Sequence, residues 1–275
     1  NYTDQEIGRA VFMKTGAIIA DADGTLIENG ELYFPRELVE VIKKARKSHL
    51  FSIASGRDLR FLQKLRGQII EDETLNPYEA VIYEDVGLSI VNGESYVLGG
   101  IDQQTLERIS LFFNQNPQLF AGLTPLPDGN FTLKTAWVTY EFADKRSTNR
   151  RVLEERFPKI KEALLSVAPE AEVKMRADAI AVMGNGLDKA IAFRKYVGLL
   201  KERLGIPHRN ILVVGDAPND KAMMINAVQN GGLAAYVGKD YNLERILSEF
   251  GNVIVTKQKG QRGTEEAIRK LILKE

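Results

Sequence analysis

Short apolar runs alternate with amphipathic segments toward both ends of the chain. The apolar runs are bounded by turn-forming residues and lie at 17–20, 50–54, 80–83, 211–214, 233–237 and 253–255. Such runs are typical of strands buried on both faces. Apolar residues recur at helical spacing within 36–48, 58–69, 188–204, 220–229, 243–250 and 264–273. This alternation predicts an α/β fold, a Rossmann-like, doubly wound parallel sheet covered by helices.

The middle of the chain departs from this rhythm. Its pattern predicts a helix at 103–114, an alternating stretch at 131–142, a long helix at about 148–167 and strands at 171–175 and 179–183. We therefore expect an inserted α+β cap domain over 88–183, within a core domain made of 1–87 and 184–275. Glycines in 88–100 and 184–186 mark the expected hinges.

Composition excludes several classes of function. The 275 residues contain 37 Lys and Arg against 37 Asp and Glu, so no overall field favours nucleic acid or an anionic membrane as a partner. The chain has no cysteine, which excludes disulfides, thiolate metal sites and cysteine nucleophiles. No apolar run reaches the roughly 20 residues that span a bilayer. We expect a cytoplasmic monomer or homodimer; the role of residues 1–15 stays open.

Polar residues gather where the predicted strands end, which is where open parallel sheets bind ligands. The motifs are Asp21-Ala22-Asp23-Gly24-Thr25-Leu26, Ser55-Gly56-Arg57 and Gly215-Asp216-Ala217-Pro218-Asn219-Asp220, with Lys189 opening the helix after the insertion. Carboxylates, a hydroxyl and a cation on one rim suit phosphoryl transfer, which needs in-line positioning and positive charge. Clustered aspartates also require a hard cation, and Mg²⁺ fits because it takes oxygen ligands.

The carboxylates divide into reacting groups and metal ligands. Asp21 is the expected nucleophile toward phosphorus. Asp23 is expected to protonate the leaving alkoxide and then to activate water. Asp216 and Asp220 are expected to hold Mg²⁺ together with Asp21. Aspartates also cap turns and helices, and this structural role is the alternative for all four residues.

The remaining polar residues are expected to bind the phosphate group. Ser55, in the Ser55-Gly56 turn, can donate a hydrogen bond to a phosphate oxygen, or it can cap the helix after the turn. Lys189 can neutralise both the nucleophile and the transferring group. Asn219 is a weaker candidate for the same pocket. For Arg57, a substrate contact and a surface salt bridge are equally plausible.

These motifs, in this order, resemble those of the haloacid dehalogenase-like hydrolases, over about 17–83 and 184–255. The position of the insertion resembles the type C2 cap of phosphatases that act on phosphoglycolate, sucrose phosphate, mannosyl-phosphoglycerate or trehalose phosphate, and of Cof-like sugar phosphatases. The resemblance implies the same residue roles, and adds the backbone carbonyl of Asp23 as a magnesium ligand. The sequence departs from the family at Glu84-Asp85-Val86-Gly87, where Glu-Asn-Gly is common, and at Ala190, where many relatives have glycine.

The expected activity is Mg²⁺-dependent hydrolysis of a small phosphorylated metabolite, a sugar phosphate or phosphoglycolate, through an aspartyl phosphate. Two alternatives stay open. A phosphomutase or other phosphotransferase would pass the phosphoryl group from Asp21 to a sugar. A catalytically weak relative would bind a phosphorylated ligand or partner as a regulator.

Overall fold

The computed structural model describes residues 14–28, 31–69, 76–126, 137–142, 149–176 and 179–275. These residues form two compact units. The core unit contains the described residues up to Tyr96 and those from Asp188 to Glu275, and the inserted unit contains those from Val97 to Leu187. The segment 88–100, in which a hinge is expected, contains the boundary between the two units and also contributes to two strands of the core sheet.

The core sheet has eight strands in the order β12-β11-β10-β1-β2-β3-β4-β5. Its strands are β1 (Gly16–Asp21), β2 (His49–Ala54), β3 (Ala80–Tyr83), β4 (Gly87–Ile90), β5 (Ser95–Val97), β10 (Ile211–Gly215), β11 (Leu233–Tyr236) and β12 (Val253–Val255). Every pairing from β12 to β3 is parallel, and β3 pairs with β4 antiparallel. The predicted α/β Rossmann-like fold is confirmed.

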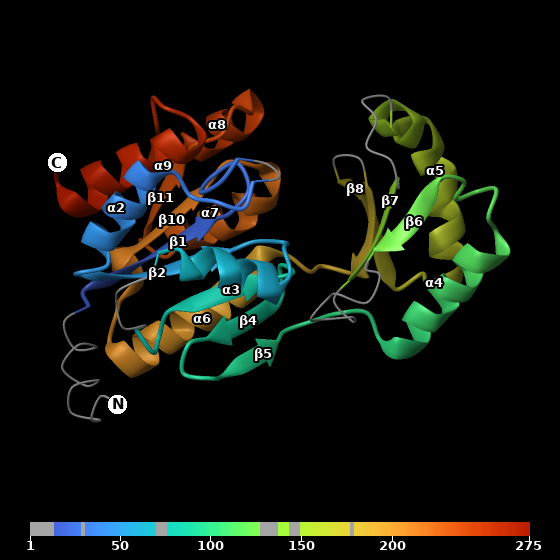
Figure 1. Cartoon of the computed structure of the whole chain (residues 1–275), viewed down its shortest axis with the longest axis horizontal. Helices are drawn as coiled ribbons and strands as arrows, with labels where there is room; N and C mark the ends of the chain where they lie inside the picture. The colour runs from blue at the N-terminus through green and yellow to red at the C-terminus, as the bar shows by residue number, and fades with distance from the viewer. Residues whose placement is uncertain (1–13, 29–30, 70–75, 127–136, 143–148, 177–178) are drawn as a thin grey trace. The chain divides into compact units, whose positions relative to one another are not determined.

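Helices cover both faces of this sheet. They are α2 (Arg36–Ala45), α3 (Leu59–Gly67), α6 (Lys189–Leu204), α7 (Lys221–Gln229), α8 (Tyr241–Leu247) and α9 (Gly260–Ile268), and a π-helical turn, Arg269–Leu273, comes after α9. Helix α2 packs against α9 on one side of the sheet, and α6 packs against α7 on the other (Figure 1). Both faces of the central strands are therefore buried from solvent, which explains why their sequences are continuous apolar runs.

The register of the central strands places the polar motifs next to one another. Strand β1 is buried along its whole length between β10 and β2. Asp21 lies opposite Ala54 on β2, and Ala20 lies opposite Val214 on β10. Because parallel strands end at the same edge, the residues directly after Ala54 and Val214 flank Asp21.

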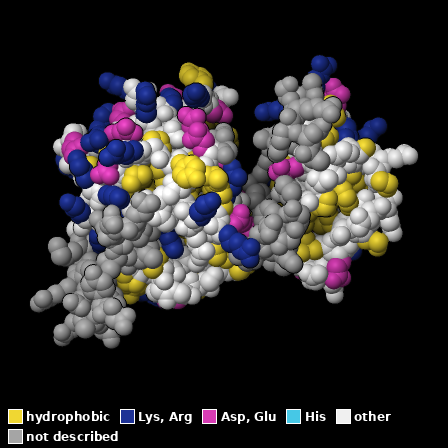
Figure 2. Space-filling model, in the orientation of Figure 1, with side chains coloured by type: hydrophobic (Ala, Val, Ile, Leu, Met, Phe, Trp, Pro, Cys, Tyr) yellow, Lys and Arg dark blue, Asp and Glu magenta, His cyan; other side chains and the backbone are white. Residues whose placement is uncertain are grey.

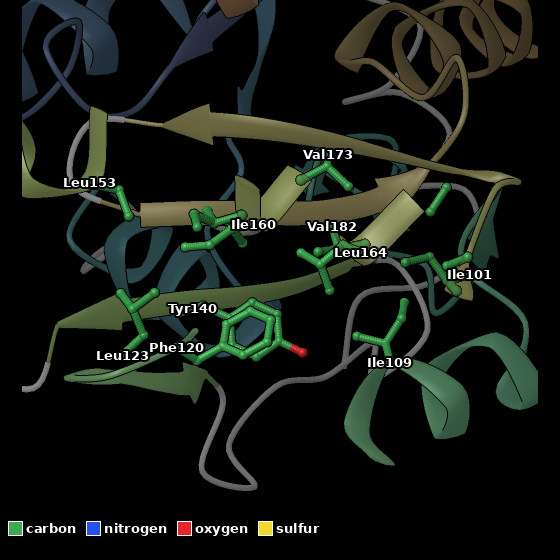
Figure 3. Packing of buried hydrophobic residues seen from close by; sticks show 13 residues of the cluster. Ile101, Ile109, Phe120, Leu123, Tyr140, Leu153, Ile160, Leu164, Val173 and Val182 are labelled. Atoms are coloured by element: carbon green, nitrogen blue, oxygen red, sulfur yellow. The ribbon is translucent and has the colours of Figure 1, made fainter. Parts of the chain in front are cut away.

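The inserted unit is a four-stranded antiparallel sheet in the order β6-β7-β9-β8. Its elements are α4 (Gln103–Gln115), β6 (Leu123–Leu126), β7 (Trp137–Phe142), α5 (Asn149–Val167), β8 (Ala171–Arg176) and β9 (Ala179–Gly184). Figure 3 shows its core, where residues from α4, α5 and the sheet meet around Phe120 and Tyr140. The first part of the predicted alternating stretch, 131–136, lies outside the described residues.

Charged helix surfaces carry both signs. Figure 2 shows Lys and Arg next to Asp and Glu over the part of the core unit that holds α2 and α9. On α9 and the π-helical turn after it, Arg269 pairs with Glu265 and Lys270 with Glu266, as expected of a solvated helix. None of the helices in the described part of the chain is long and apolar enough to cross a membrane.

A buried ion pair links helix α2 to the core sheet. Arg46, at the C-terminal end of α2, donates from Nε and Nη2 to the two carboxylate oxygens of Glu79, each at 2.9 Å. Glu79 Oε1 also accepts from the Phe51 backbone N–H at 3.0 Å, so the pair ties α2 to β2 and to the start of β3. Removing one partner of such a pair leaves a buried charge without compensation.

We expect Glu79→Ala to lower the free energy of unfolding by about 3–5 kcal/mol. The matched control is Glu275→Ala, whose carboxylate pairs at the surface with Arg269 and, at 3.5 Å, with Lys44, and should contribute about 1 kcal/mol or less. Urea unfolding of the two variants and the native protein measures both effects. Equal losses in the two variants would contradict this role for Glu79.

Candidate active site

A lysine buried between two carboxylates lies at the carboxyl edge of the core sheet. Lys189 begins α6, whose N-cap Asp188 accepts a hydrogen bond from the Ala190 N–H at 2.8 Å. The Lys189 side chain is fully buried, and its Nζ donates to Asp21 Oδ1 and, at 2.7 Å, to Asp220 Oδ1. This arrangement joins β1, α6 and the segment after β10 through one ammonium group.

Asp220 has both carboxylate oxygens engaged. While Oδ1 accepts from Lys189, Oδ2 accepts from the backbone N–H groups of Asp216 and Ala217 at 3.1 and 3.2 Å. A Cβ at Gly215 would lie 2.6 Å from the Asp220 Cβ, so only glycine permits this close return of the chain. Asp220 thus fixes Lys189 and the loop that carries Asp216, whether or not it also binds a metal.

Asp216 is held against the loop after β1. Its Oδ1 accepts from the Thr25 hydroxyl at 3.0 Å, and the Thr25 side chain is completely buried. Gly24 has a φ of 79°, and a Cβ at this position would lie 2.3 Å from Asp216 Oδ2. Glycine is therefore required at position 24 for two reasons: the backbone has a positive φ, and a side chain would collide with Asp216. Sequence analysis included Thr25 in the motif but gave it no role.

The three carboxylates fit a divalent metal ion. Asp21, Asp216 and Asp220 each offer an oxygen, and these oxygens lie within 4.8 Å of one another. Three carboxylates against the single ammonium of Lys189 leave a net negative charge, which a hard cation such as Mg²⁺ would balance. Two of the three are buried and Asp216 is partly buried, so repulsion between them is weakly screened by solvent.

The pKa values in this cluster follow from burial and from neighbouring charges. Burial alone would lower the pKa of Lys189, but Asp21 and Asp220 outweigh it and raise that pKa, so the ammonium stays charged. Burial raises the pKa of Asp216 to about 6, with a further contribution from Asp220. Burial and Asp220 also raise the pKa of Asp21, whereas Lys189 lowers it. An added cation would further favour the ionised form of Asp21.

Asp23 lies in a second ion pair, beside the buried cluster. Arg57 donates from Nε and Nη2 to the two oxygens of Asp23 at 2.9 and 2.8 Å, and its guanidinium lies 4.9 Å from the ring centre of Phe61. The Arg57 backbone N–H donates to Ser55 Oγ at 3.1 Å, which leaves the Ser55 hydroxyl hydrogen free to donate elsewhere. A bidentate pair fixes the plane of the Asp23 carboxylate. The salt bridge considered for Arg57 is present, and its partner is Asp23.

The end of β3 folds over the Ser55 turn. Glu84 and Asp85 have φ values of 48° and 62°, a left-handed conformation that is unfavourable for residues with a Cβ. The Glu84 N–H donates to Arg57 O at 3.0 Å and the Asp85 N–H to Ser55 O at 3.4 Å. Both side chains are buried, and Asp85 helps to raise the pKa of Lys189. The departure noted from the family's motif therefore places a further carboxylate beside the cluster.

Two of the predicted site residues, Gly56 and Asn219, are less closely connected to the carboxylate cluster than the others. Gly56 is half-buried in the turn between Ser55 and Arg57. Asn219, on the short helical turn Pro218–Asp220, is exposed, and no hydrogen bond joins it to the cluster within the described part of the chain. The geometry thus groups Asp21, Asp216, Asp220 and Lys189, and the register and the Arg57 contacts bring Ser55 and Asp23 beside them.

Comparison with known proteins agrees with the sequence motifs. Residues 18–124 match the family described as haloacid dehalogenase-like hydrolase. The predicted family resemblance is confirmed. The match begins within β1 and ends within β6, so it includes the Asp21 and Ser55 motifs of the haloacid dehalogenase-like hydrolases. No curated protein sequence gives a significant match.

Solved structures share the fold at low sequence identity. A haloacid dehalogenase-like hydrolase from Bacteroides thetaiotaomicron aligns with a TM-score of 0.66 and 15% identity, over 94% of this chain and 100% of that one. The C-terminal domain of trehalose-6-phosphate phosphatase from C. albicans aligns with a TM-score of 0.63 and 14% identity, over 98% of this chain and 97% of that one. At these identities the likeness shows the fold.

We expect Mg²⁺ to raise the melting temperature of the native protein, because a ligand bound only by the folded state stabilises it. Gly24→Ala should abolish this shift, since the added methyl group would displace Asp216. Gly93→Ala is the matched control: Gly93 has a φ of 96° with open space around its would-be Cβ. It should cost about 1–2 kcal/mol of stability and keep the Mg²⁺ response. Thermal unfolding with and without Mg²⁺ measures this, and a shift retained in Gly24→Ala would contradict the metal site.

Proposed function

We propose that the protein is a Mg²⁺-dependent phosphatase that hydrolyses the phosphate monoester of a small metabolite, with Asp21 as the phosphorylated nucleophile. The observation that carries the proposal is the buried Lys189 between Asp21 and Asp220, with Asp216 beside them. One Asp21 oxygen is taken by Lys189, so the other is the attacking atom. The match of residues 18–124 to the haloacid dehalogenase-like hydrolase family supports hydrolysis as the type of reaction.

Charge stabilisation follows from the same contacts. Asp21, Asp216 and Asp220, with the backbone carbonyl of Asp23, would hold the magnesium ion, which would neutralise negative charge on the phosphoryl oxygens. Asp220 already accepts three hydrogen bonds. We therefore propose that it binds the magnesium ion either directly or through a water molecule. The Ser55 hydroxyl and the backbone of Gly56 would donate to the phosphate, and Lys189 would offset charge on the nucleophile and the phosphoryl group.

Proton transfer is assigned to Asp23. In the first step the Asp21 oxygen forms a bond to phosphorus, the ester P–O bond breaks, and Asp23 gives its proton to the departing alkoxide oxygen. In the second step Asp23 takes a proton from water as that water attacks phosphorus, which releases inorganic phosphate and restores the Asp21 carboxylate. Arg57 acts as a positioning residue, since it holds both oxygens of Asp23.

Substrates of the sugar phosphate or phosphoglycolate class are proposed from the resemblance of the motifs. Trehalose-6-phosphate phosphatases from C. albicans and Aspergillus fumigatus are among the structures that share the fold, at 14% and 16% identity. The role of the inserted unit as a C2-type cap that selects the substrate is part of this proposal.

The Asp21→Asn variant should lose phosphatase activity by a factor of about 10³ or more, because an amide cannot attack phosphorus. The measurement is phosphate release from a panel of phosphorylated metabolites, with and without Mg²⁺. Asp58→Asn is the matched control: Asp58 is the N-cap of α3, and asparagine caps helices equally well. Equal turnover in native protein and Asp21→Asn would contradict the proposal, as would turnover independent of Mg²⁺.

Asp23→Asn should separate the two chemical steps. Poor leaving groups such as sugar alkoxides need protonation, so their release should slow by about 10²–10⁴-fold. p-Nitrophenolate leaves without a proton, so p-nitrophenyl phosphate should give a burst of one product per enzyme, and then slow hydrolysis of the phosphorylated Asp21. Stopped-flow absorbance measures the burst. Equal slowing for both substrates without a burst would exclude the acid–base role of Asp23.

A further inference from the structure

A cavity of about 660 Å³ opens in the core unit beside Asp216. Gly24, Ile27 and Glu28 after β1 line it together with Asp216 of the carboxylate cluster, and the segments after β11 and β12 line the rest. The proposed phosphoryl chemistry uses neither of these two segments. The cavity therefore lies beside the candidate active site, but the proposed reaction gives no role to the residues of these two segments.

Three cations line this cavity from two different segments. Lys239 comes after β11 and is exposed, and Arg262 lies in the first turn of α9 and is also exposed. Within the described residues neither has a carboxylate partner within ion-pair distance. Lys259 lies 5.6 Å from the ring centre of Tyr236 and pairs loosely with Glu244 at 3.7 Å. Apart from Asp216, the acidic group on the wall is Glu28.

The start of α9 adds backbone donors to this wall. The helix begins at Gly260, whose N–H donates to Val237 O, and the N-cap Lys259 provides no side-chain acceptor for the next N–H groups, those of Gln261 and Arg262. Such groups carry partial positive charge and bind anions. A helix start would not make a site alone, but here it coincides with a cavity and with the exposed cations of Lys239 and Arg262.

The cavity wall is fixed to the catalytic loop. The Thr264 hydroxyl on α9 donates to the Thr25 backbone oxygen at 2.8 Å, and the Gly260 N–H donates to Val237 O at 2.9 Å. A Cβ at Gly260 would lie 3.3 Å from the Gly24 backbone oxygen. The first turn of α9 is thus held against the loop that carries Asp21 and Asp23, so an anion bound in the cavity would lie next to the reacting centre.

We propose that this cavity is a second oxyanion subsite, formed by Lys239, Arg262, Lys259 and the first turn of α9. It takes a carboxylate or a second phosphate of the substrate, so the favoured substrates are phosphate esters that carry another anionic group. The inference rests on the proposed function for its substrate. The same chemistry would also accept free inorganic phosphate, and the test distinguishes the two sources.

The test compares substrates that differ in one anionic group, namely 3-phosphoglycerate with glycerol 3-phosphate, and fructose 1,6-bisphosphate with fructose 6-phosphate. The readout is the ratio of kcat/KM within each pair. Lys239→Gln and Arg262→Gln should each lower this ratio about tenfold in at least one pair, through KM. The matched control is Lys257→Gln, an exposed lysine of the same segment that does not line the cavity, and it should leave the ratio unchanged.

Titration calorimetry of the Mg²⁺-loaded protein with inorganic phosphate measures how many phosphate ions bind per chain, and this measurement does not depend on turnover. The double variant Lys239→Gln/Arg262→Gln could bind one phosphate fewer per chain while the kcat/KM ratios within the substrate pairs stay unchanged. This result would identify free inorganic phosphate as the occupant of the subsite. Unchanged ratios together with unchanged phosphate binding would overturn the subsite. If no substrate is hydrolysed at all, the proposed function fails, and the phosphate titration still decides whether the subsite exists.

Discussion

The burial of Lys189 between Asp21 and Asp220 is the interaction on which the site depends. Removing charges from water costs several kcal/mol per ion, and only close, hydrogen-bonded partners offset that cost. Three segments far apart in sequence must therefore meet at one ammonium group. The surplus of carboxylates over cations at this point is what makes the arrangement suited to a metal ion, since a fully neutralised cluster would attract none.

The fold makes this meeting possible through strand register. Strand β1 is central, and its neighbours β2 and β10 end beside Asp21. Hydrogen bonds to the backbone then fix the segments beyond the strand ends, because Asp220 holds the Asp216 loop and the end of β3 covers the Ser55 turn. The candidate reacting groups thus lie on short segments anchored to the strands, which would limit the reorganisation needed for a phosphate to bind.

Sequence predicted the elements whose patterns are strong. The six parallel strands are continuous apolar runs, and their ends carried the motifs. It did not predict β4 and β5, which lie in the segment expected as a hinge, or β6, an edge strand in which Pro125 is tolerated. The pairing of Arg57 with Asp23 could not be read from sequence, because it depends on side chains 34 residues apart meeting across two strands. The cavity beside Asp216 could not be predicted from the sequence, because the segment 257–262, which leads into the first turn of α9, has no periodic pattern and the net charge of the chain is zero.

The cations of the core unit differ in what they can do. Lys189 is buried and doubly paired, so in the proposed reaction its charge would be preorganised for the phosphoryl group in the transition state. Lys239 and Arg262 are exposed, so in the proposed subsite they could adjust to a bound anion and would contribute equally to the ground and transition states. Uniform binding of this kind lowers KM without raising kcat. On these two proposals the buried cation would serve catalysis and the exposed cations would serve substrate selection, although both lie along the same edge of one sheet.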